Sequence, residues 1–189
     1  FDTVKLADLE PALETAMANH LAELDAIAAN EEPATFENTI LAMEDAGARN
    51  IEIFSDYGIV CTTTNNAASL TRHLMNSLAA EKPDAIVFEL GDGLLGAYGV
   101  GAILNDEEIR DALTAVVLCA NDPVSAWGGV ELLRNEFQIE PALVTGPATD
   151  NEVGVQQIDE RTSLPAINAL VNPVELGDKV ADLLKKESS

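Results

Sequence analysis

Positive charge is scarce in this sequence. Its 189 residues include 10 Lys and Arg against 33 Asp and Glu, which gives a formal net charge of −23. Such a chain repels the phosphate backbone of a nucleic acid unless a local basic patch reverses the field, and the sequence contains no such patch. We therefore expect no nucleic-acid partner. The acidity fits either solubility and adaptation to high salt or storage of cations, and the sequence leaves both open.

Long apolar runs and closely spaced cysteines are also missing. No apolar stretch approaches the roughly 20 residues that a membrane-spanning helix needs, and no charged segment followed by an apolar one opens the chain. We therefore expect a soluble, cytoplasmic protein without a membrane partner. The two cysteines, Cys61 and Cys119, stand far apart at the ends of apolar β-like runs, so we expect both to be buried, reduced thiols.

The first quarter of the chain has the periodicity of two amphipathic helices. Helices are predicted over residues 8–30 and 35–47, and the apolar residues of the first recur on one face. Together they form an αα-hairpin over residues 1–48. A hairpin of this size does not bury both apolar stripes by itself, so it must dock on the remaining chain or on a second copy. We predict a homodimer through this hairpin.

Residues 49–189 are predicted to form an α/β domain, with a mostly parallel sheet flanked by helices. The organising element is a strand over residues 84–90, which is almost continuously apolar and is therefore expected to be buried on both faces. The remaining pattern alternates strands with helices, which indicates a parallel sheet. Further strands are expected over residues 51–54, 57–63, 114–120, 142–145 and 166–170. Further helices are expected over residues 67–82, 106–112, 123–137, 151–161 and 174–186.

Acidic side chains stand where two of these strands end. Glu89 and Asp92 close the first, and Asp122 follows the strand over residues 114–120. Ligands of open α/β sheets bind beyond the carboxyl ends of the strands, so these three residues are the predicted catalytic residues and metal ligands. An all-carboxylate set suits magnesium, manganese or calcium better than zinc.

Small polar residues follow the other strands. Asn121, Thr145, Gly146 and Asp150 are the predicted ligand-binding residues, because small residues let backbone N–H groups approach a ligand and helix N-termini favour anions. The same residue types are also common in helix caps and turns, and this second interpretation requires no ligand.

The amino-terminal quarter resembles a family of peptidases. Residues 33–40 read Pro-Ala-Thr-Phe-Glu-Asn-Thr-Ile and residues 1–5 read Phe-Asp-Thr-Val-Lys, and residues 1–47 as a whole look like the first helices of the thimet oligopeptidase and dipeptidyl carboxypeptidase family. The resemblance implies a zinc peptidase whose metal lies on an H-E-x-x-H helix. That motif is absent from the sequence, so no catalytic residue is carried over and this peptidase mechanism is excluded.

Residues 50–189 resemble the second half of dethiobiotin-synthetase-like P-loop domains. In that resemblance, residues 84–92 correspond to the acidic strand that positions magnesium, and residues 145–151 correspond to a loop beside the nucleotide. The phosphate-binding G-x-x-x-x-G-K-[ST] motif is absent, which argues against ATP hydrolysis. The two resemblances together suggest a chimera, formed by natural recombination or by construction.

Two functions follow from these observations. The first is a metal-dependent hydrolase, in which Glu89, Asp92 and Asp122 hold a divalent cation that activates water for attack on a phosphate or related small-molecule ester. The second is a non-catalytic, anion- or nucleotide-binding-like remnant domain that dimerises through its hairpin. The same acidic residues serve both functions, so the sequence does not decide between them.

Overall fold

The computed structural model describes residues 47–187. The chain divides into two compact units, Phe1–Ile53 and Phe54–Ser189, and the fold below is that of the second unit. The predicted helical hairpin over residues 1–48 lies almost entirely outside the described residues, as does the proposed dimer contact through it. Both stay predictions.

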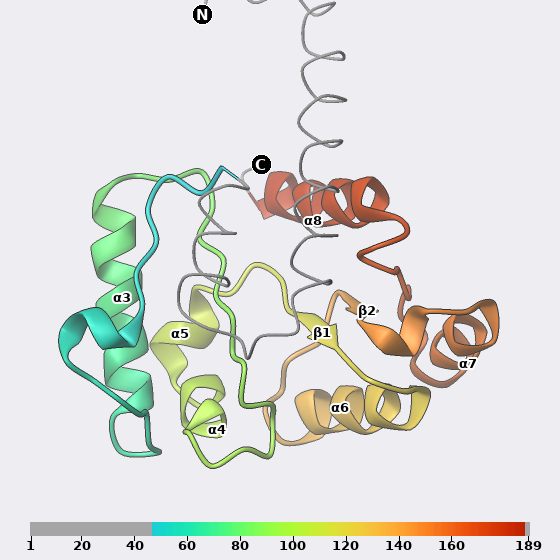
Figure 1. The fold of residues 1–189 in the computed structure, drawn as a ribbon, viewed down its shortest axis with the longest axis horizontal. Helices are drawn as coiled ribbons and strands as arrows, with labels where there is room; N and C mark the ends of the chain where they lie inside the picture. The colour runs from blue at the N-terminus through green and yellow to red at the C-terminus, as the bar shows by residue number, and fades with distance from the viewer. Residues whose placement is uncertain (1–46, 188–189) are drawn as a thin grey trace, which may run out of the picture. The chain divides into compact units, whose positions relative to one another are not determined.

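The described chain is a mixed α/β structure that is mostly helical (Figure 1). Six α-helices, two short 3-10 helices and two strands lie within residues 47–187. In chain order they are η1 Phe54–Tyr57, α3 Ala67–Ala80, α4 Val100–Leu104, α5 Glu107–Asp111, β1 Val117–Cys119, α6 Pro123–Asn135, β2 Leu143–Thr145, η2 Pro147–Thr149, α7 Glu152–Thr162 and α8 Pro173–Glu187. None of these helices has the length and apolar character needed to span a bilayer.

The sheet is small and parallel. Strand β1 pairs with β2 in the register Val117 to Leu143, Leu118 to Val144 and Cys119 to Thr145. A single parallel bridge joins Val144 to Ala166 on the other side of β2. Helix α6 connects the two strands, and α7 lies between β2 and the bridge in the sequence. The predicted parallel arrangement is therefore confirmed, although the sheet is much smaller than expected.

The predicted central strand over residues 84–90 is wrong. This segment belongs to no strand, and its side chains alternate between exposed and half-buried, with Val87 92% exposed. Leu90, at its end, packs against the buried cluster of Val100, Leu104, Leu133 and Phe137. A strand buried on both faces needs a packed layer on each side, and within residues 47–187 this segment has packing on one side only. Its continuous apolar character was therefore misleading.

Three other predicted strands are also absent or reduced. Residues 51–54 and 57–63 form no strand, and Phe54–Tyr57 is a 3-10 helix instead. The strand expected over residues 166–170 is reduced to the bridge at Ala166. In this last segment the Asn168 side chain accepts backbone N–H bonds from Leu170 and Val171, each at 2.9 Å, and so bends the chain into a turn.

The helices follow the sequence more closely. Asp106 caps α5 by accepting a hydrogen bond from Ile109 N at 3.2 Å, at the start of the helix predicted over residues 106–112. Helix α6 begins at Pro123 behind Asp122, and α7 begins behind Asn151, whose Oδ1 accepts from Gly154 N at 2.9 Å. These starts agree with the preference of Asp and Asn for the N-cap and of Pro for the first turn.

The main core lies between the sheet and helices α6 and α7. Ala126 and Val130 of α6, Val144 of β2 and Ile158 of α7 have no exposed surface. Close approach of α6 to the sheet depends on Gly129, because a Cβ there would lie 2.9 Å from Leu118 Cδ2. This packing fixes the direction in which each strand residue points, and so positions the candidate site.

Candidate functional site

Cys119 and Thr145 lie side by side at the carboxyl ends of β1 and β2. Leu118 and Val144, one residue earlier in each strand, face α6, since Leu118 contacts Gly129 and Val144 packs with Ala126. Successive side chains in a strand point to opposite faces. Cys119 and Thr145 therefore point to the face of the sheet that is turned away from α6.

The hydroxyl of Thr145 is buried without a hydrogen bond. Thr145 is 4% exposed, and within residues 47–187 its Oγ1 is the one buried side-chain nitrogen or oxygen that has no hydrogen-bond partner. A buried polar group in this condition destabilises a fold by about 1–3 kcal/mol. Such groups are rare in native proteins, and a functional role is one recognised explanation for them.

Glu89 lies close to Cys119. Cys119 is exposed, which corrects the prediction of a buried thiol. Partial burial of its sulfur, and then the negative charge of Glu89, raise the pKa of the thiol above its ordinary value. The thiol is therefore protonated at neutral pH. We call Cys119 and Thr145 together the strand-end site.

Asp122 has a structural role. Its Oδ1 accepts hydrogen bonds from Val124 N at 2.8 Å and from Ser125 N at 2.9 Å. In return, Ser125 Oγ accepts a hydrogen bond from Asp122 N at 3.0 Å, which completes a capping box at the start of α6. Neighbouring Asn121 is exposed just before it. The predicted catalytic acid is thus engaged in starting a helix.

Asp92 also has a structural role, because it accepts a backbone hydrogen bond. Its Oδ2 accepts a hydrogen bond from Tyr98 N at 2.8 Å and closes the glycine-rich loop that leads to α4. The carboxylate lies directly against Gly96, where a Cβ would stand 1.7 Å from Oδ2. Glycine is required at that position because any side chain would displace Asp92.

The three predicted metal ligands do not form one site. Among the residues that the structure describes, no three His, Cys, Asp or Glu side chains are grouped so that they could hold a metal ion. Asp92 and Asp122 each accept backbone hydrogen bonds in separate loops. The donor set that magnesium, manganese or calcium would need is therefore not assembled from Glu89, Asp92 and Asp122.

Comparison with known proteins gives no relative. No protein-family model, curated protein or solved structure matches this chain. The two resemblances drawn from the sequence are therefore not tested. The function must be argued from the geometry alone.

Gly146 and Asp150 lie in the loop that follows β2. Gly146 has a φ of 91°, and a Cβ there would lie 2.8 Å from the carbonyl oxygen of Ala120. Asp150 Oδ1 accepts a hydrogen bond from Asn168 Nδ2 at 2.9 Å. The structure thus brings the predicted residues Thr145, Gly146 and Asp150 to one end of the sheet, but it gives Gly146 and Asp150 roles in joining adjacent chain segments.

The helix N-termini beside this end of the sheet are closed by side chains of the protein. Asp122 caps α6, and Asn151 caps α7. An anion would have to displace these groups and would also meet the negative charges of Asp122 and Glu152. The predicted preference of these N-termini for anions is therefore offset by their own caps.

A cavity lies at the opposite end of the sheet, beside the start of β1. This cavity has a volume of about 430 Å³, and its lining includes Arg110, Val116 and Glu140. Arg110 Nη1 donates to the Phe137 carbonyl at 3.3 Å, and Arg134 Nε donates to Glu140 at 2.8 Å. The hydrogen bond from Arg134 lowers the pKa of Glu140. These groups are already partnered, so the cavity makes a weaker case for a ligand than Thr145 does.

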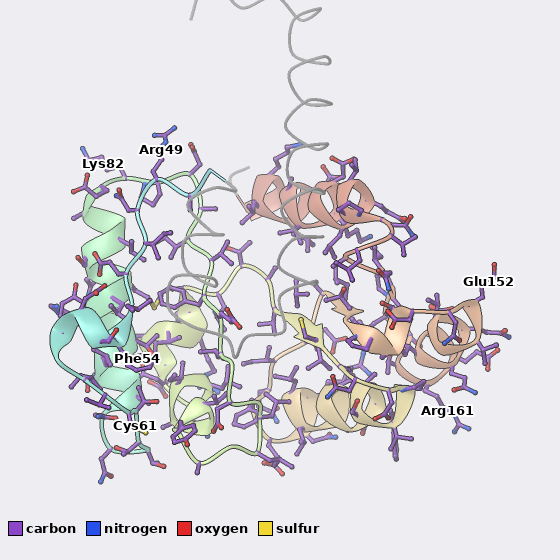
Figure 2. The ribbon with its side chains drawn as sticks, in the orientation of Figure 1. Arg49, Phe54, Cys61, Lys82, Glu152 and Arg161 are labelled. Carbon is purple, nitrogen blue, oxygen red and sulfur yellow. The ribbon has the colours of Figure 1, made fainter. Side chains whose placement is uncertain are left out.

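Cys119 was not among the predicted site residues. Its position near the end of a predicted strand was visible in the sequence. Its register with Thr145 depends on the pairing of β1 with β2, which α6 separates in the sequence. Cys61 is exposed as well, which also corrects the prediction of a buried thiol there. It lies in the loop before α3 (Figure 2), where its Sγ donates to Thr62 O at 3.3 Å. Only one of the two cysteines therefore belongs to the site.

Proposed function

We propose that the Phe54–Ser189 unit is a non-catalytic domain that binds a small molecule at the strand-end site. One observation carries the proposal: the buried Thr145 hydroxyl has no hydrogen-bond partner. A hydroxyl with no role could be replaced by a methyl group of similar shape with no loss to the fold. Retention of the hydroxyl is explained if a bound molecule provides the missing hydrogen bond.

The position of Thr145 supports the same proposal. In open parallel α/β sheets, ligands bind beyond the carboxyl ends of the strands, and Thr145 ends β2 next to the end of β1. Cys119 lies beside it in the strand pairing and adds a thiol, whose pKa is raised by burial and then by the charge of Glu89. A few polar groups that converge on one point are typical of sites that orient a small ligand.

Hydrolysis by a bound metal ion has less support. It requires a carboxylate set free to hold the ion, whereas Asp92 and Asp122 are hydrogen-bonded to backbone N–H groups of their own loops. The thiol of Cys119 is a poor nucleophile because its raised pKa keeps it protonated. Binding without chemistry is the function that these residues support best.

Chemical-shift perturbation in the full chain tests the proposal. The uniformly ¹⁵N-labelled protein is titrated separately with n-butylammonium, 1-butanol and butyrate, which share a four-carbon chain and differ in charge. We expect at least one of them to shift the backbone amides of Cys119, Thr145 and Gly146. Thr145→Val should abolish these shifts, whereas Thr145→Ser, which keeps the hydroxyl, should retain them.

The same titration includes a matched control. Thr149→Val removes another buried threonine hydroxyl, one that already donates to Gly146 O at 2.7 Å, and it should leave the binding shifts in place if the domain stays folded. Absence of shifts at the strand ends with all three probes at tens of millimolar would overturn the proposed function. Shifts that persist unchanged in folded Thr145→Val would overturn it as well.

A further inference from the structure

One edge of strand β1 has backbone groups without a partner. Val116 O and Ala120 N are hydrogen-bonded to the β2 side of the sheet, at 2.8 and 2.9 Å. Alternate residues of a strand direct their N–H and C=O groups to opposite edges, so those of Val117 and Cys119 point away from β2. Within residues 47–187, no strand pairs with that outer edge.

The outer edge of β1 is also uncharged and exposed. Val117 is 37% exposed, and Cys119 is exposed as well. No charged residue and no proline occurs over residues 112–121. Natural proteins protect edge strands with charges, proline or a covering segment, because an unprotected edge pairs with other chains. Within the described chain, the short length of β1 is the only such protection that this edge has.

The charge of the chain decides which partner fits this edge. The formal net charge is −23, and the exposed residues Asp111 and Asp122 bound the uncharged segment in the sequence. A second copy has the same charge and is repelled, whereas a basic partner is attracted. Only an extended backbone can match the N–H and C=O groups of a strand edge.

We propose that β1 is a docking edge for an extended, basic peptide segment of another protein. The peptide adds to the sheet as a further strand, and its backbone forms hydrogen bonds with the N–H and C=O groups of Val117 and Cys119. Its alternate apolar side chains contact the side chains of these two residues, as cross-strand neighbours do. This interaction is separate from the proposed small-molecule site and does not depend on it.

A synthetic heptapeptide, acetyl-Lys-Val-Thr-Val-Thr-Val-Lys-amide, tests the proposal on the ¹⁵N-labelled full chain. In the free protein the amide hydrogens of Val117 and Cys119 should exchange rapidly, and saturating peptide should slow both by about tenfold or more. The Leu118 amide faces β2 and should exchange slowly in both states. The same peptide with Glu in place of both Lys should bind about tenfold more weakly, because the chain repels it.

Proline substitutions in the protein give a second test. Val117→Pro removes an N–H that points away from β2, so the domain should stay folded and lose the peptide, since strands tolerate proline on an open edge. Val87→Pro changes a valine that is 92% exposed in the unpaired segment over residues 84–90, and this matched control should bind the peptide like the parent. If Val117→Pro unfolds, the exchange rates of the parent protein decide the outcome.

The results that would overturn the proposal are distinct. Slow exchange of Val117 and Cys119 in the free protein would show that the edge is already covered, by a second copy if the protection is lost on dilution and by another segment of the chain if it is not. Equal affinity for the Lys and Glu peptides would overturn the basic partner. Unchanged peptide binding in folded Val117→Pro would place the peptide elsewhere.

Discussion

The acidic side chains of this protein show how one residue type serves different purposes. Asp92 closes a loop, Asp122 starts a helix and Glu89 lies beside a thiol. All three stand at the ends of apolar segments in the sequence, so the sequence pattern alone predicted all three as metal ligands. Their hydrogen bonds separate them, because a carboxylate that accepts backbone N–H bonds is already in use.

A pair of substitutions at Asp122 tests whether its role is structural. Asp122→Ala should lower the free energy of unfolding by about 0.5–2 kcal/mol because α6 loses its N-cap. Asp122→Asn keeps an oxygen that can accept from Val124 N and Ser125 N, and should be close to the parent in stability. Urea denaturation measures both. Equal destabilisation by the two variants would mean that the charge of Asp122, and not its cap, stabilises the protein.

The reactivity of Cys119 tests the position of Glu89. In a Cys61→Ser background, where Cys119 is the only thiol, Glu89→Gln removes the charge that helps to raise the pKa of Cys119. The thiolate fraction at pH 8 should increase, and alkylation by iodoacetamide should become severalfold faster. The pH–rate profile should move to lower pH. An unchanged profile would show that burial alone sets the pKa of this thiol.

At the scale of elements, helix starts could be predicted better than strands, since only the strands predicted over residues 114–120 and 142–145 contain strands of the structure. Asp106, Asp122 and Asn151 act as caps through local hydrogen bonds, and local chemistry is readable from sequence. A strand needs a partner, and the partner of an apolar segment is decided by the whole fold. Residues 84–90 are as apolar as β1 but pair with nothing in the described chain.

The candidate site could likewise be predicted only in part from the sequence. Thr145 and Glu89 could be named from their places at the ends of apolar runs, whereas the pairing of Thr145 with Cys119 and the effect of the Glu89 charge on that thiol depend on the fold. The missing hydrogen bond of Thr145 is a property of the folded interior and has no counterpart in the sequence. The location of the site was therefore partly predictable, and its chemistry was not.

Two adjacent glycines of α6 test how closely this helix packs on the sheet. Gly128→Ala meets no atom within 4 Å and should raise stability by about 0.5–1 kcal/mol, the usual gain of alanine over glycine in a helix. Gly129→Ala places a Cβ against Leu118 and should lower stability by about 1–3 kcal/mol through overpacking. Thermal unfolding of the two variants side by side gives the comparison. A stabilising Gly129→Ala would contradict the close contact between α6 and β1.

At the scale of the whole molecule, the association state stays a prediction from the amino-terminal sequence. The apolar stripes expected over residues 8–30 and 35–47 exceed what one domain face ordinarily covers, and we expect a homodimer. Light scattering at micromolar concentration should give twice the mass of the 20.0 kDa chain. Leu24→Glu should split the dimer or unfold the hairpin, because it would bury an unpaired carboxylate. A monomer mass for the intact parent protein would remove the prediction.

The proposed binding function depends on one property of Thr145: its hydroxyl is kept for a ligand and weakens the fold in the absence of that ligand. Stability spent on a binding site in this way is a recognised trade-off in natural proteins. The claim concerns the free protein, so its test requires no knowledge of the ligand.

The free energy of unfolding of Thr145→Val, measured by urea denaturation beside the parent protein without ligand, is the most direct test. Valine has nearly the shape of threonine and removes the unpartnered hydroxyl, so we expect stability to rise by up to about 1–3 kcal/mol. Thr149→Val, which removes a hydroxyl bonded to Gly146 O, should lower it. If Thr145→Val is instead less stable than the parent, the hydroxyl stabilises the fold and the proposed binding function is wrong.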